Sequence, residues 1–378
     1  MRLLATNAHE RFLTRSYFSS LDGLRCLAIL PVIWHHSTPR PLPGLLGKGP
    51  AGVDLFFCIS GFLITTLLVR EKARFGSIRL RAFYARRALR ILPLYYVVLA
   101  SYVLYAVTLP ASSAPRAHFF RTLPYYVTFT ANWFGSFAVT HPILFAFSWS
   151  LCIEEQFYAF WPWLVDKLPR SGALVAMLGL IALDYFTERG ALAFALPPGS
   201  LGERVLTSFA TPIGLGAVLA LALDSTRGFA FLEPFLARIW NAPLALLSVL
   251  ALLAWPSAPL FVFHLGLAWL VAACAVNERN GLAALLTARA PSYVGRVSYG
   301  LYLLNSTAIA LVHRAFPGRV ESSLFVFTLG LPLALALASL SHRFIEAPCL
   351  RLRARFRAQA PLTSASESAA PPSPALPQ

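Results

Sequence analysis

Apolar runs of about twenty residues recur along most of the chain, and they decide what it can fold into. A run of that length can cross the hydrocarbon core of a bilayer as one helix. Of the 378 residues, 57% are hydrophobic and only 13% are charged, whereas an ordinary soluble domain has about 25% charged residues. A soluble protein of this size would lack the charge to cover its surface. The sequence therefore predicts an all-α, polytopic membrane protein.

Clusters of charge separate the apolar runs into about ten transmembrane helices. The predicted spans are 22–38, 51–69, 91–109, 144–165, 171–187, 203–223, 242–256, 259–276, 297–315 and 322–341. Segment 123–139 is also apolar, but it contains Asn132, Gly135 and two threonines. We interpret it as a re-entrant or surface-lying segment.

Three parts of the chain follow from these spans. Residues 1–20 are an N-terminal segment, residues 21–345 form the transmembrane domain, and residues 346–378 are a basic segment with a tail. The tail is rich in Ala, Ser and Pro, a composition that predicts disorder because little of it can be buried.

The distribution of basic residues predicts how the chain is oriented in the membrane. With ten spans, 23 Lys and Arg fall on the side of the termini and 8 on the other side. Because cytoplasmic loops collect Lys and Arg, both termini are predicted to lie in the cytoplasm, with the chain in the plasma (bacterial inner) membrane. The net charge of +16 therefore indicates a lipid bilayer as partner and no nucleic acid.

Several kinds of site find no support in the sequence. The five cysteines include no CxxC pair, so neither a disulfide framework nor a metal site is indicated. The chain has no Gly-rich phosphate loop, HExxH or GxSxG pattern. Nucleotide hydrolysis, zinc proteolysis and serine-hydrolase chemistry are therefore not indicated.

Ionisable residues inside the first span need a reason, because each costs about 2.5–3.5 kcal/mol or more to insert. Asp22 and Arg25 are three residues apart and can meet on one helix face. Arg25 and His36 are eleven apart, so they project from nearly the same side, about 16 Å apart along the axis. His35 points roughly a quarter-turn away. Catalysis at His36 and a packing role for it both stay open, as does an anchoring role for Arg25.

Polar residues also interrupt the second and fourth spans. Asp54 lies near one end of the second span, and Ser60 and Gly61 lie further in. A Ser-Gly pair lets helices approach closely, so packing alone could explain it. Glu154 lies in the middle of the fourth span, where a carboxylate is costly, and can share a face with Tyr158 four residues on.

A pair of arginines, Arg87 and Arg90, precedes the third span and shares one helix face. Arginine forks suit phosphate groups. A basic loop of this kind is equally typical of a topology anchor, and the sequence leaves the two interpretations open.

Taken together, the order and spacing of six blocks resemble the integral-membrane acyltransferase family 3, from Tyr17 to Leu352. Members of that family acylate sugars of surface polysaccharides, O-antigen, nodulation factors and similar acceptors. The blocks are LDGLRCLAILPVIWHH, GVDLFFCISGFLIT, FYARRALRILPLYY, WSLCIEEQFY, VSYGLYL and RFIEAP.

The resemblance assigns roles to the residues that fall on the family's motifs. The residues implied in catalysis are His36, Arg25 and Glu154. Those implied in binding the acyl donor are Arg87, Arg90, Ser60 and Gly61. Those that could bind the acceptor or orient other groups are Asp54, Trp149, Tyr158 and Asn305. Many members have a histidine at the position of Asn305, so this departure could reshape the acceptor side.

The implied reaction moves an acyl group, expected to be acetyl, from cytoplasmic acyl-CoA to a hydroxyl of a saccharide or glycolipid acceptor. Acyl-CoA would be a co-substrate, with no permanently bound cofactor. His36 would act as general base, since an imidazole suits that task at neutral pH, or would carry the acyl group itself. The alternative is a glycolipid or small-solute transporter or flippase that uses the intramembrane charges as a polar path.

Overall fold

The structure is a computed structural model that describes residues 2–38, 44–135 and 145–356. Within these ranges every regular element is helical, which confirms the predicted all-α fold. The helices are α1 (Arg2–Thr14), α2 (Ser19–His36), α3 (Ala51–Phe75), α4 (Leu80–Thr108), α5 (Ala114–Val127), α6 (Ala131–Phe134), α7 (Ser148–Lys167), α8 (Arg170–Glu188), α9 (Leu201–Thr207), α10 (Thr211–Asp224), α11 (Thr226–Leu236), α12 (Asn241–Ala254), α13 (Leu260–Val276), α14 (Ala283–Leu286), α15 (Arg289–Arg296), α16 (Ser298–Ala315), α17 (Ser323–Ser341) and α18 (Ala347–Leu352). Short 3-10 turns lie at Gly44–Gly47, Pro317–Arg319 and Arg353–Phe356, and a π-helical turn, His342–Glu346, joins α17 to α18.

The helices that could cross a membrane number four to seven among the described residues. Helices α3, α4, α8 and the continuous run Ser323–Leu352 are each long and apolar enough. Three bent pairs, α1 with α2 (65°), α9 with α10 (44°) and α11 with α12 (82°), raise the number to seven. Helical structure occupies each of the ten predicted spans, but the predicted count of ten is not confirmed. Helix α13 has only 17 residues, and polar residues lower the hydropathy of α7 and α16.

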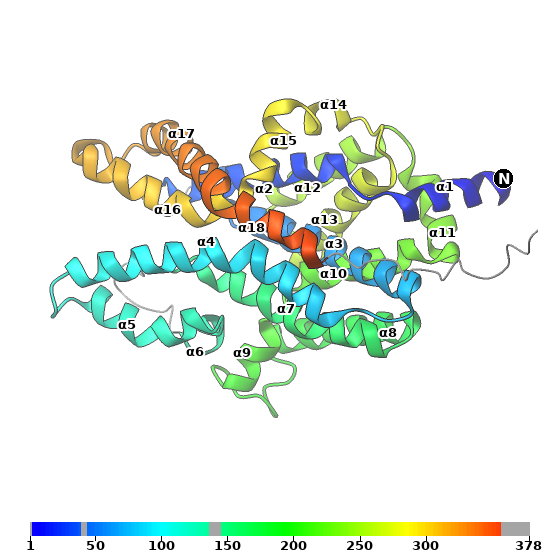
Figure 1. Cartoon of the computed structure of the whole chain (residues 1–378), viewed down its shortest axis with the longest axis horizontal. Coiled ribbons are helices and arrows are strands. Elements are labelled where there is room, and N and C mark those ends of the chain that lie inside the picture. The colour runs from blue at the N-terminus through cyan, green and yellow to red at the C-terminus, as the bar shows by residue number, and fades with distance from the viewer. Residues whose placement is uncertain (1, 39–43, 136–144, 357–378) are drawn as a thin grey trace, which may run out of the picture.

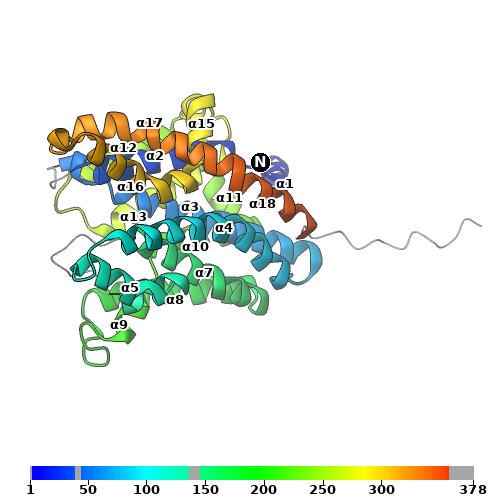
Figure 2. The ribbon, with the colours of Figure 1, turned by 60° about the vertical axis from the view of Figure 1, so that its left-hand side comes forward.

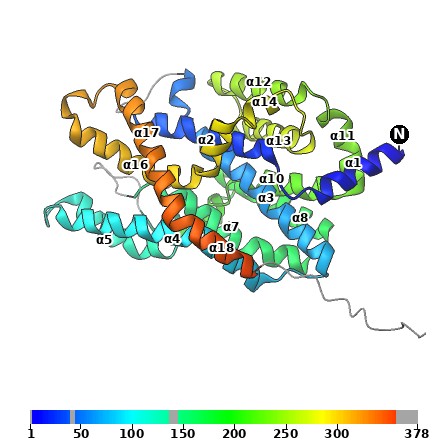
Figure 3. The same cartoon turned by 45° about the horizontal axis from the view of Figure 1, so that its top comes forward.

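Helix α3 lies near the centre of the bundle, with α2 and α10 beside it (Figures 2 and 3). Two glycines let α3 and α10 cross closely. A Cβ on Gly61 would collide with the carbonyl oxygen of Ile213, and one on Gly216 would collide with that of Cys58. Small residues at a helix crossing are the usual way for helices to pack inside a membrane. This contact fixes α3 and therefore the polar residues on its other face.

Helix α7 is tied to α3 at one end by a lysine. The Lys72 ammonium group donates hydrogen bonds to the carbonyl oxygens of Val165, Asp166 and Leu168 at 2.8–2.9 Å. These carbonyls end α7 and have no partner within the helix, and a cation there also complements the helix dipole.

The two described ends of the chain lie in the same half of the molecule (Figure 1). Helix α1 packs on α11, with the His9 ring 4.7 Å from that of Phe229. The C-terminal helical run passes through residue 346 without a break, where the sequence placed the end of the transmembrane domain. The tail predicted to be disordered falls mostly on 357–378, outside the described residues.

The segment predicted to be re-entrant or surface-lying, 123–139, spans the end of α5 and all of α6. Phe129, with a φ of 54°, lies between these two helices. Neither helix is among the candidate membrane spans. Residues 136–139 lie outside the described ranges.

Candidate active site

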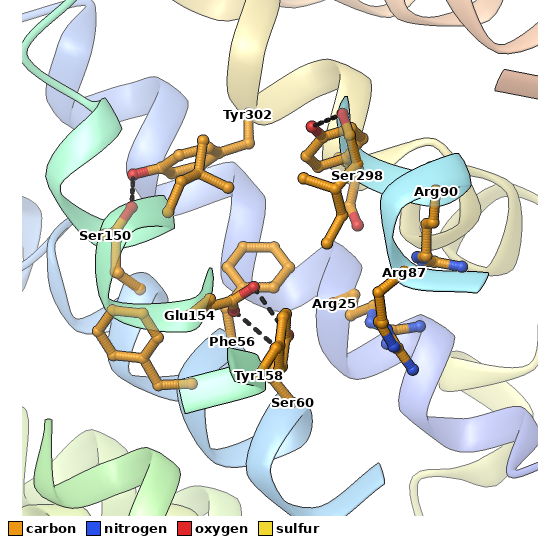
Figure 4. A pocket seen from close by; sticks show the side chains of 15 residues that line it. Arg25, Phe56, Ser60, Arg87, Arg90, Ser150, Glu154, Tyr158, Ser298 and Tyr302 are labelled. Atoms are coloured by element: carbon orange, nitrogen blue, oxygen red, sulfur yellow. Dashed lines mark hydrogen bonds between the residues drawn. The ribbon is translucent and has the colours of Figure 1, made fainter. Parts of the chain in front are cut away.

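A polar cavity of about 100 Å³ lies inside the bundle where α2, α3, α4, α7 and α16 meet (Figure 4). We call it the central cavity. A space of this size holds several waters. Its polar lining consists of Arg25, Ser60, Arg87, Arg90, Ser150, Glu154, Tyr158, Ser298, Tyr299 and Tyr302.

The Glu154 carboxyl group is the acidic centre of this cavity. Ser60 Oγ donates a hydrogen bond to its Oε1 at 2.9 Å, and the Tyr158 hydroxyl donates one to its Oε2 at 3.0 Å. The predicted shared face of Glu154 and Tyr158 is thereby confirmed. Both carboxyl oxygens have a donor, as buried polar groups require.

Three arginines face Glu154 from α2 and α4 (Figure 4). Arg25 pairs with Asp22 at 3.1 Å, as their spacing predicted. The Arg87 guanidinium lies over the ring of Tyr158, 5.4 Å from its centroid. Arg87 and Arg90 make no ion pair with any described residue, in contrast to Arg86, which pairs with Glu71 at 2.8 Å. No carboxylate lies within ion-pair distance of either guanidinium group among the described residues, although Glu154 and Glu155 lie near Arg87 and Glu346 lies near Arg90.

A larger cavity of about 390 Å³ adjoins the central one, and we call it the vestibule. The two share Arg25, Ser60, Arg87, Arg90 and Tyr158 in their linings, so they are contiguous. The remaining acidic, basic and histidine side chains of the vestibule are Asp22, Arg70, Arg296, His342, Glu346 and Arg353.

Two vestibule residues have structural partners. Arg70 donates to the carbonyl oxygens of Phe12 and Arg15 at the end of α1. The Tyr17 hydroxyl donates to the Asp22 carboxylate, and partial burial together with this hydrogen bond raises the pKa of Tyr17 to about 12. Both residues hold the segment between α1 and α2 in place.

His36 lies in a third cavity, of about 700 Å³, which we call the histidine cavity. Its lining shares no residue with the other two cavities. Ser150 and Tyr302 of the central cavity form a hydrogen bond of 2.5 Å. Both hydroxyls also lie within hydrogen-bond distance of the carbonyl oxygen of Phe147, which lines the histidine cavity. Ser150, Tyr302 and Phe147 therefore form a partition between the two cavities.

Asn305 determines which nitrogen of His36 carries the proton. Its amide nitrogen donates to the carbonyl oxygens of Leu301 (3.0 Å) and Tyr302 (2.6 Å). Its amide oxygen therefore faces Nδ1 of His36, at 2.6 Å. Because that oxygen can only accept, neutral His36 is protonated at Nδ1 and keeps its lone pair on Nε2.

Four of the predicted site residues do not line any of these cavities. Asp54 lies 3.7 Å from Nε2 of His264, and Gly61 packs on α10. The Trp149 ring is 37% exposed and packs edge-on against Phe57. Asn305 does not line a cavity either, but it contacts His36 directly.

Ser150 and Tyr302 lie in the blocks WSLCIEEQFY and VSYGLYL, but the resemblance implied no separate role for either residue. They are 152 residues apart, so no spacing rule connects them. Metal binding has no visible site: in the described ranges no three His, Cys, Asp or Glu side chains gather as metal ligands would.

Apolar helices around cavities with polar lining residues define an integral-membrane protein whose candidate site lies within its helical bundle. The model of the acyltransferase domain family matches residues 18–343. The chain therefore belongs to this family of acyltransferases.

Among the relatives that share 27% identity with the chain, two are named OatA. One is the peptidoglycan O-acetyltransferase OatA of Listeria monocytogenes, aligned over 89% of this chain and 56% of its own length. The other is the O-acetyltransferase OatA of Staphylococcus aureus, aligned over 90% of this chain and 58% of its own length. The chain thus spans less than three fifths of the length of these relatives. No solved structure matches the chain.

Proposed function

We propose that the protein is an O-acetyltransferase that moves an acetyl group from acetyl-CoA to a hydroxyl of a carbohydrate-containing acceptor. One observation carries the proposal. Arg87 and Arg90, which make no ion pair with a described residue, line both the central cavity and the vestibule, and His36, whose Nδ1 faces Asn305, lines the histidine cavity beyond the partition. The names of the relatives support acetyl as the transferred group, and one of them supports a carbohydrate acceptor.

The proposal includes ten spans in the bacterial plasma membrane, with both termini and the vestibule facing the cytoplasm. Asp22 at the start of α2 lines the vestibule, and His36 at its end lines the histidine cavity. Helix α2 has 18 residues, which correspond to a length of about 27 Å, most of the thickness of the hydrocarbon core. Reporter fusions after Arg74 and after residue 358 should both read cytoplasmic. A reading from the opposite side at either position would contradict this topology.

Acetyl-CoA enters from the vestibule in this mechanism. Arg87 and Arg90 bind its phosphates through charge-assisted hydrogen bonds, and the narrow pantetheine arm extends into the central cavity. The acetyl thioester then approaches the partition at Tyr302.

His36 supplies the base for the transfer. Nε2 takes the proton from the acceptor hydroxyl while that oxygen attacks the thioester carbonyl. The C–S bond breaks, the electron pair leaves with the CoA sulfur, and the imidazolium returns the proton to it. Acetylation of Nε2 itself, followed by transfer to the acceptor, is an alternative use of the same lone pair. In either case the partition must open, because it separates the thioester from His36.

Purified protein in lipid nanodiscs tests the reaction directly. We expect acetyl-CoA labelled in its acetyl group to release CoA and to leave an alkali-labile label in the saccharide fraction of added cell-envelope material. Absence of CoA release would contradict the proposal. Movement of a glycolipid across the bilayer without consumption of acetyl-CoA would favour the transporter alternative.

A further inference from the structure

The histidine cavity has a charge pattern that indicates what its ligand carries. Arg314 is its one permanently charged lining residue, and no acidic side chain lines it among the described residues. A cavity with one sign of charge and apolar walls concentrates ligands of the opposite sign. The cavity volume of about 700 Å³ lies in the usual range for a small-molecule site.

Arg314 has no partner in the described part of the chain. It makes no hydrogen bond, ion pair or ring contact there, whereas Arg116 donates to the carbonyl oxygen of Leu109 and Arg204 to that of Trp133. The Arg319 guanidinium, in the turn after α16, lies over the ring of Phe325. Arg121 is likewise exposed and has none of these contacts among the described residues, but Arg314, also exposed, lines the histidine cavity whereas Arg121 lines none of the three cavities.

The position of Arg314 suits the end of an acceptor rather than its reacting hydroxyl. Ser306, Thr307, Ala310 and Arg314 line the cavity from one side of α16. Arg314 follows Thr307 by seven residues, which corresponds to about 11 Å along the axis. The hydroxyl to be acetylated must reach Nε2 of His36, so a charged group on the same molecule would meet Arg314 about two helical turns further out.

The walls of the cavity suit a saccharide. Tyr102, Phe145 and Phe147 present aromatic rings, and Ser101, Ser306 and Thr307 present small hydroxyls. Such a mixture of apolar faces and a few polar groups is typical of sites that orient a small polar ligand. Tyr105 and Leu311, which are 49% and 47% exposed, continue the lining to the surface of α4 and α16.

We propose that the histidine cavity binds an acceptor saccharide that carries an anionic group, phosphate or carboxylate, and that Arg314 binds that group. This inference rests on the proposed function, because it assigns the cavity to the acceptor. The anionic group can belong to a soluble saccharide or to a phosphate that links the saccharide to a membrane lipid.

Binding of three probes to the purified full chain tests the inference. They are a neutral oligosaccharide, the same oligosaccharide with a terminal phosphate, and that phosphate esterified to a short isoprenoid. The two phosphorylated probes should bind roughly 10–100-fold more tightly than the neutral one, the range for hydrogen bonds to charged groups. A further gain with the isoprenoid would assign the acceptor to the bilayer, and equal affinity would assign it to solution; either result supports the anionic site.

Variants locate the effect. Arg314→Gln should remove the preference for phosphate, and Arg314→Lys should keep part of it because the charge remains. The matched control, Arg319→Gln, should keep the whole preference. Equal binding of neutral and phosphorylated probes, no binding of any probe, or a preference that survives in Arg314→Gln would overturn the inference.

Acetyl-CoA binding is measured on the same preparation. Tight donor binding without a phosphate preference would contradict the acceptor inference alone. Failure to bind acetyl-CoA would contradict the proposed function instead.

Discussion

Replacing Asn305 by leucine should slow acetyl transfer without weakening acetyl-CoA binding. The substitution removes the oxygen that accepts from Nδ1 of His36, so the imidazole is no longer held with its lone pair on Nε2. Asn305 is fully buried and leucine has a similar volume, so the packing cost should be modest. Asn305 lines neither the central cavity nor the vestibule, and the donor site is left intact.

The size of the effect follows from the one hydrogen bond that is lost. A hydrogen bond between neutral groups contributes about 0.5–1.5 kcal/mol, which corresponds to a fall in kcat of roughly 2- to 12-fold. The KM for acetyl-CoA should stay unchanged. Asn305→His should recover most of the rate, because a ring nitrogen can again accept from Nδ1.

The assay is steady-state CoA release at matched protein levels in nanodiscs. Asn241 provides the control, since it is also fully buried and accepts a hydrogen bond from Trp269 at 2.6 Å, but outside these cavities. Asn241→Leu should lower thermal stability and leave kcat of the folded fraction as it was. An unchanged kcat in Asn305→Leu would refute the claim that the hydrogen bond from Nδ1 of His36 to Asn305 contributes to catalysis.

Three further substitutions, each with a control, test the donor site and the helix crossing. Arg87→Ala and Arg90→Ala should each weaken acetyl-CoA binding, measured by calorimetry, by roughly 10- to 100-fold. The control Arg81→Ala, at an exposed position of the same helix, should bind acetyl-CoA as the parent does. If all three variants bind acetyl-CoA with the affinity of the parent, Arg87 and Arg90 are topology anchors. Gly61→Val should destabilise the protein by about 1–3 kcal/mol or more, seen as a lower thermal midpoint, because its Cβ meets backbone of α10. Gly179→Val has open space and should change the midpoint little; a similar midpoint for both variants would argue against the close crossing.

Helical spacing was sufficient for contacts within one helix. The pairs Asp22–Arg25 and Glu154–Tyr158 form as predicted, because residues three or four apart share a face whatever surrounds them. Long apolar runs likewise predicted the all-helical fold, although the number of spans stays a proposal. A helix that lines a polar cavity, such as α16, is less apolar than a helix that faces lipid. Hydropathy alone therefore fails to identify such a helix as a membrane span.

Contacts between helices could not be derived in this way. The family resemblance implied a donor-binding role for Gly61, but its surroundings are set by Ile213 of α10, far along the chain. His36 meets Asn305 across 269 residues, and Asp54 lies beside His264 rather than His36. Periodicity shows which residues share a face of a helix but not which other helix covers that face.

The central claim is that His36 is the base, and it is tested most directly by comparing it with its neighbour. His35 lines none of the three cavities, so it is a matched control one residue away. Rates of acetyl transfer are measured for His36→Ala, His36→Asn and His35→Ala at equal membrane levels.

The account predicts that His36→Ala loses roughly 10²- to 10⁴-fold in rate, the usual range for removal of a general base. His36→Asn should be equally impaired, because an amide cannot take the proton. His35→Ala should stay close to the parent. Full activity of His36→Ala would contradict the account.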